Sequence, residues 1–111
     1  MKKTIRSYDF EFDKGERRII NAFCKQILKQ VAGIPEHFKT EQVFNSVSEK
    51  INGGEDVIRL TKNEYMIFGM QLKSNIRYLN DKMDKAWFIK KWIFKSLRSQ
   101  YALVYEKHFK E

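Results

Sequence analysis

The side chains with the best spacing for chemistry are two series of cations, and the chemistry that they suggest is phosphate binding. At about 100° per residue, each series falls on one face of a predicted helix. The series are made of Lys91, Lys95 and Arg98 in the last helix and of Arg18, Lys25 and Lys29 in the first. The second series spans about 16 Å and could follow a phosphate backbone. The alternative is that both faces contact only water.

Aromatic side chains lie between the cations in residues 86–105, AWFIKKWIFKSLRSQYALVY. The apolar arc of this predicted helix is much wider than the roughly 100° stripe of an ordinary surface helix. We expect a core helix that is buried on two sides and shows a narrow basic ridge. An interface with a protein partner or a second copy is the alternative, with Trp87, Phe88 and Trp92 as anchors. A membrane-surface helix is disfavoured, because such helices divide their faces more cleanly. The rings could also stack on single strands, but we expect most to be buried.

Catalytic and metal-binding patterns are not found in the sequence. The chain has one cysteine, Cys24, and two histidines, His37 and His108, without the spacing of metal ligands. Cys24 lies on an apolar helix face, which predicts an inert thiol in the core. Neither a P-loop nor a dinucleotide fingerprint is present. We therefore expect a non-enzymatic protein without metal or cofactor.

Two DNA-binding motifs fit the order of the elements only in part. A ribbon-helix-helix would read bases with the outward face of its strand, but here that face carries Asp9 and Glu11, which repel phosphates. A helix-turn-helix could connect the first two helices, but the connection GIPEHFK is longer than the usual three or four residues.

The predicted elements that position these residues are four helices and two short strands. Alternating aromatics predict a strand over about residues 4–12, and the β-branched segment over about 56–60 predicts its partner strand. Asp13 with Glu16, and Thr61 with Glu64, have the spacing of capping boxes. The helices are expected over about 14–32, 40–52, 61–80 and 84–108, with Gly33 ending the first. The fold class is mainly α (α+β), with a two-stranded ribbon.

Length and charge limit the remaining possibilities. A chain of 111 residues predicts a single compact domain. The net charge is +8, and eight cations lie in the first 32 residues and eight in the last 30. A lone cysteine, no visible signal peptide and no apolar run of membrane length predict a cytoplasmic protein. The frequent Lys, Ile, Phe, Tyr and Asn indicate AT-rich codons, as in many bacteria and phages.

Three functions stay open on the sequence alone. The first is a nucleic-acid-binding accessory or regulatory protein that contacts phosphates through the basic helix faces. The alternative is a protein-binding inhibitor or adaptor of the phage or mobile-element type, which would bind an acidic protein partner through an aromatic helical surface. An enzyme or its small subunit is the third. The wide apolar arc of the last helix also predicts a homodimer, and no membrane is expected among the partners.

Overall fold

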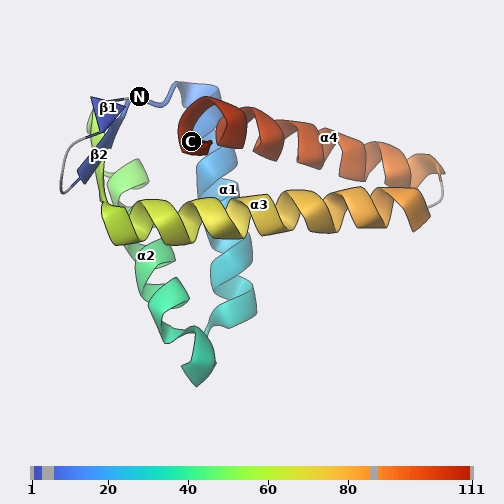
Figure 1. Ribbon diagram of the computed structural model, residues 1–111, viewed down its shortest axis with the longest axis horizontal. Helices are drawn as coiled ribbons and strands as arrows, with labels where there is room; N and C mark the ends of the chain where they lie inside the picture. Colours follow the sequence, from blue (N-terminus) through green and yellow to red (C-terminus); the bar gives the residue numbers. More distant parts are fainter. Residues whose placement is uncertain (1, 4–6, 86–87, 111) are drawn as a thin grey trace. The chain divides into compact units, whose positions relative to one another are not determined.

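The computed structural model describes residues 2–3, 7–85 and 88–110, with side chains over 8–82 and 91–110 (Figure 1). The protein is mostly helical, with four α-helices and a small antiparallel sheet, which confirms the predicted fold class. The chain divides into two compact units, Met1–Phe68 and Gly69–Glu111. The single domain expected from the length stays a prediction.

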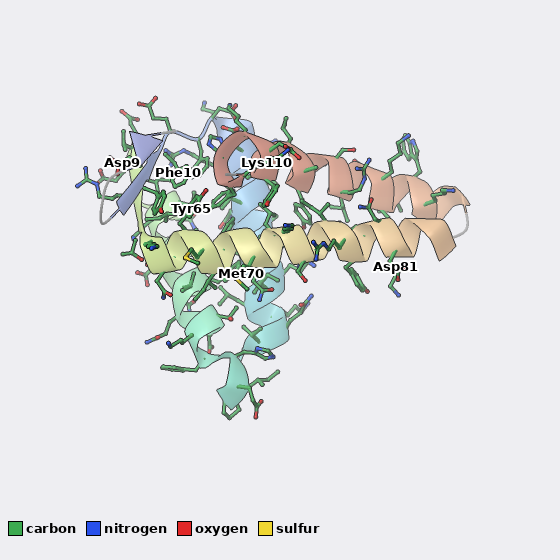
Figure 2. All side chains as sticks on the ribbon, viewed as in Figure 1. Asp9, Phe10, Tyr65, Met70, Asp81 and Lys110 are labelled. Atoms are coloured by element: carbon green, nitrogen blue, oxygen red, sulfur yellow. The ribbon has the colours of Figure 1, made fainter. Side chains whose placement is uncertain are left out.

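The sheet of the first unit contains the predicted ribbon. Strands β2 (Ser7–Phe10) and β3 (Ile58–Thr61) pair antiparallel, with Phe10 opposite Ile58 and Ser7 opposite Thr61. A two-residue strand, β1 (Lys2–Lys3), pairs with the other edge of β2 and was not predicted, because two residues have no readable period. In Figure 2, Phe10 and Tyr65 point toward each other, and their ring centroids lie 6.0 Å apart.

Helix α1 (Lys14–Val31) begins and ends where the sequence predicts. Glu16 N–H donates to Asp13 Oδ1 at 2.7 Å, and Asp13 N–H donates to Glu16 Oε1 at 2.9 Å, which completes the capping box. Gly33 has a φ of 76°, the left-handed conformation that glycine adopts without steric cost after a helix end. Both ends of α1 are therefore fixed by interactions that are local in the sequence.

The core of the first unit is a cluster of phenylalanine rings. A short 3₁₀ turn (Pro35–His37) leads into α2 (Phe38–Asn52), which packs antiparallel to α1 (Figure 1). The rings of Phe23, Phe44 and Phe68 are fully buried, with centroids 5.1 to 5.7 Å apart. Edge-to-face and stacked contacts between such rings stabilise the fold beyond the burial of their apolar surface.

The second unit contains most of α3 (Lys62–Lys85), all of α4 (Phe88–Val104) and a final π-helical turn (Tyr105–Phe109). The sequence predicted an earlier end for α3 and an earlier start for the last helix. Helix α4 runs back along α3 (Figure 1), and the turn after it lies beside the first half of α3, where a Cβ on Gly69 would be 3.5 Å from the Phe109 ring. The buried apolar side chains of this unit are Leu72, Leu79, Tyr101, Val104 and Phe109. None of the described helices has the length and hydropathy needed to cross a membrane.

Candidate nucleic-acid interface

The outward face of α4 is the most unusual surface among the described residues. Trp92 is 77% exposed, Leu103 is 59% exposed and Ile93 is 52% exposed. Burial of α4 on two sides is therefore wrong for its described part. The sequence could not show this, because apolar residues lie nearly all round this helix and any of several sides could have faced the core.

The buried side of α4 is narrow and lies opposite Trp92. It is centred on Tyr101 and Val104, with Phe94 and Leu97 half-buried at its margins. Burial raises the pKa of the Tyr101 hydroxyl, as expected for a phenol removed from water. On a helical wheel, Trp92 is separated from the two buried residues by about 120° to 180°. Its indole therefore points to solvent and is not part of the packing.

The basic ridge predicted on α4 is present in part. Lys91 and Lys95 are exposed, within about 100° of Trp92 on the same helix. Arg98 is half-buried, and its Nε is enclosed without a hydrogen-bond partner among the described residues. Of the other predicted anchors, Trp87 lies outside the described residues, and Phe88 begins α4 with a side chain outside them.

The basic stripe predicted on α1 is exposed along its whole length. Arg18, Lys25 and Lys29 all face solvent, opposite the side of α1 that carries Phe23 and Cys24. This is the division of faces that the 3.6-residue period predicts. Helix α1 lies in the first unit and α4 in the second, so the two faces are separate candidate surfaces.

Arg17, the neighbour of the α1 stripe, has a different role that sequence reasoning missed. Its Nε donates to Phe12 O at 3.0 Å, and Nη1 donates to Ile51 O at 3.3 Å. Its Nη2 donates to Glu55 O at 2.5 Å and to Asp56 O at 3.2 Å. Arg17 thus connects the start of α1 to the end of α2 and the loop after it. Nothing in the sequence distinguishes it from Arg18.

A polar network at the start of α3 also serves the fold. Glu64 Oε1 accepts from Lys50 Nζ at 2.7 Å and from Thr61 N–H at 2.9 Å, and Ser46 Oγ donates to Glu64 Oε2. Desolvation alone would raise the pKa of Glu64. The hydrogen bonds from Lys50, Ser46 and Thr61 and the charge of Lys50 outweigh it, so this pKa is lowered. Because both carboxylate oxygens are occupied, we assign Glu64 a structural role.

Nucleophilic and metal sites receive no support from the described residues. Cys24 is fully buried, and burial raises the pKa of its thiol to about 12, which confirms the predicted core position. Among the described residues, no group of three or more His, Cys, Asp or Glu side chains could hold a metal ion. Two open depressions on the first unit, of about 620 and 710 Å³, are lined by mixed charges and include Lys50 and Arg17, both already bonded.

No protein-family model, curated protein or solved structure matches the chain. The exposed helix faces are then the guide to function. One face carries cations alone, on α1. The other carries cations beside an exposed indole, on α4.

Proposed function

We propose that the protein is a small, non-enzymatic nucleic-acid-binding protein with an accessory or regulatory role. The observation that carries the proposal is the exposed Trp92 beside Lys91 and Lys95, on a helix with four cations and no acid. A positively charged surface attracts phosphates, and the indole ring adds a stacking contact with a base that a face with cations alone does not have. The stripe of Arg18, Lys25 and Lys29 on α1 supplies a second set of phosphate contacts.

Binding of this kind is driven by release of the counterions around the nucleic acid. Its affinity should therefore fall steeply between about 50 and 200 mM salt. Contacts to phosphates position a protein but carry no sequence information. We accordingly propose a protein that discriminates little between sequences.

The test is a titration of labelled oligonucleotides, single-stranded and duplex, followed by fluorescence anisotropy at low and high salt. The double substitution Lys91→Glu with Lys95→Glu should weaken binding at least about tenfold, since it replaces two attractive charges by repulsive ones. The matched control is Lys39→Glu with Lys73→Glu, which changes the net charge equally at exposed sites on α2 and α3. Equal losses of affinity in both double variants would mean that the overall net charge, and not the α4 face, determines binding. No binding of either oligonucleotide at low salt would refute the proposal.

A second candidate function, the protein-binding inhibitor or adaptor, is favoured by one specific observation. Ile93 and Leu103 are exposed on the same helix as Trp92, and clusters of large apolar side chains on a surface mark interaction sites. The partner would be acidic, to match the lysines, or a second copy in a homodimer. Sedimentation of the protein alone and with nucleic acid separates these cases, because only a homodimer changes mass without a ligand.

The cellular setting that we propose is the cytoplasm of a bacterium or a phage-infected cell. The single cysteine is buried and unpaired, as suits a reducing compartment. A nucleic-acid-binding role fits this setting, since the cytoplasm is where such ligands are found. Fractionation of cells that express a tagged chain would test the location directly.

A further inference from the structure

The geometry of α4 points to single-stranded nucleic acid as the ligand class, with Trp92 stacking on an unpaired base. This inference rests on the nucleic-acid-binding function proposed above and specifies its ligand. It starts from the position of the indole. Trp92 stands on the convex outer surface of a helix, 77% exposed, and not in a pocket that a folded ligand would enter.

An indole in this position can stack only on a base whose face is open. In a duplex the base faces are covered by their stacked neighbours, so a protruding ring meets only phosphates, sugars and base edges. In a single strand the bases can splay out and stack on aromatic side chains, and every base offers such a face. The ring therefore favours the single strand, and it does so without regard to sequence.

The neighbours of Trp92 fit the phosphates on either side of a stacked base. Lys91 precedes the ring by one residue, and Lys95 follows it by about 4.5 Å along the helix axis. Ser96 and Ser99 are exposed one and two turns after the ring on the same face. Their hydroxyls could accept or donate hydrogen bonds at base edges. An aromatic platform flanked by cations is the arrangement that sequence-tolerant single-strand binders use.

The charge of α4 selects this occupant over a second copy of the chain. The exposed face of α4 carries Lys91 and Lys95, and the helix has no acid over Phe88–Val104, so pairing two copies of it face to face would bring like charges together. A polyanion instead gains from every lysine on the face. The stripe on α1, which has Ala22 between its cations and no exposed ring, offers no comparable preference for unpaired bases.

The experiment compares an oligothymidylate with a duplex of equal length, in a Trp87→Phe background so that tryptophan emission reports Trp92 alone. We expect the single strand to quench this emission. In the chain with Trp87 intact, Trp92→Leu should weaken single-strand binding about 5- to 150-fold, the range measured for loss of one stacking ring. The salt dependence should not change, because the indole carries no charge. Phe38→Leu, which removes an exposed ring from α2 in the first unit, should bind as the wild type does.

Three other outcomes would refute stacking of Trp92 on an unpaired base. If duplex and single strand bind equally and Trp92→Leu changes neither affinity, stacking is refuted while the phosphate-binding function stands. If no nucleic acid binds at low salt, both the function and its ligand class are refuted. If Trp92→Leu and Leu103→Ala each convert a dimer into a monomer, a second copy covers the face and the inference is overturned. Circular dichroism of each variant verifies that it is folded.

Discussion

The two units of this protein differ in their aromatic side chains: contacting rings form the core of the first unit, and a tryptophan of the second unit is exposed. In Met1–Phe68, the rings of Phe23, Phe44 and Phe68 are completely buried and contact one another. In Gly69–Glu111, Trp92 is 77% exposed and Tyr78 is 55% exposed. A ring buried against other rings contributes to folding, whereas a ring in water does not. The second unit also buries Tyr101 and Phe109, so its contrast with the first is the exposed Trp92, which contributes little to folding and remains available for binding.

Both units expose cations, but the polar side chains with several bonded partners described above lie in the first unit. The first unit surrounds Glu64 and Arg17 with specific partners, each of which connects segments distant in sequence. In the second unit, the Nε of Arg98 is enclosed without a described hydrogen-bond partner, and an exposed indole stands beside Lys91 and Lys95. Saturated networks fix a structure, while cations that face solvent remain able to bind a ligand.

The largest expected effect is on stability, and it compares one ring from each unit. Phe23→Ala should lower the free energy of unfolding by about 3–5 kcal/mol, because it leaves a cavity in a closed core. Trp92→Ala should change it by no more than about 0.5 kcal/mol, because the side chain lies in water. Urea denaturation followed by circular dichroism measures both. Comparable losses for the two variants would show that Trp92 is a packing residue and would remove the contrast between the units.

The reactivity of Cys24 tests whether the core of the first unit is closed. With a pKa raised from 9.0 to about 12, the thiolate fraction at neutral pH falls about a thousandfold. Alkylation by iodoacetamide should accordingly be slow in the folded protein and fast in urea, as read by mass spectrometry. Labelling of the native protein at the rate of the unfolded chain would mean that α1 opens readily and that the core of the first unit is not closed.

The Glu64 network predicts a loss of stability in acid that belongs to the first unit. Since the pKa of Glu64 in the folded state lies below its ordinary value of 4.5, the unfolded chain takes up this proton more readily. The stabilisation is complete above pH 4.5 and is lost as the pH falls through the lower folded pKa. Glu64→Gln should cost about 1–3 kcal/mol at neutral pH and should reduce this acid dependence.

The control for this prediction is Glu49→Gln, an exposed acid one residue before Lys50. It should keep both the stability and the acid dependence of the wild type. Urea midpoints measured from neutral pH down to pH 3 compare the three proteins. If Glu49→Gln shifts the profile as much as Glu64→Gln does, the acid dependence comes from the overall charge of the protein and not from the network.

The parts of the fold that the sequence predicts are those governed by local interactions. Residues three to four apart determine the capping boxes of Asp13 and Thr61 and the two faces of α1. The sequence pattern therefore predicts these features. The bonds from Arg17 to the carbonyls of Ile51, Glu55 and Asp56 reach 34 to 39 residues along the chain and have no local signal. For α4, composition showed excess apolar surface, but only packing decides that Tyr101 is buried and Trp92 is exposed. The sequence predicted Lys91 and Lys95 as binding residues together with four other cations, and the exposed Trp92 is the reason to single these two out as a candidate site.

The smallest expected effect is a change in the salt dependence of binding, which distinguishes the basic faces of the two units. Removing one cation that binds a phosphate should reduce the slope of log affinity against log salt by about 0.7 on single strands and about 0.9 on duplex. The slope on the single strand should therefore fall by about 1.4 in the double variant Lys91→Ala with Lys95→Ala. It should fall in the double variant Arg18→Ala with Lys25→Ala only if the α1 stripe also binds the single strand. Anisotropy titrations at several salt concentrations measure these slopes on both ligands.

The pattern across the two ligands identifies which unit binds what. If the α4 pair changes the slope on the single strand and the α1 pair changes it mainly on duplex, each unit contributes a surface of its own. If the α4 and α1 double variants change the salt slope equally on both ligands, the cations of the two units attract nucleic acid without preference for one face. The exposed ring on α4 then does not determine where the single strand binds. In that case the contrast between the units concerns stability alone, because phosphate attraction without a stacked base has no means of preferring one face over the other.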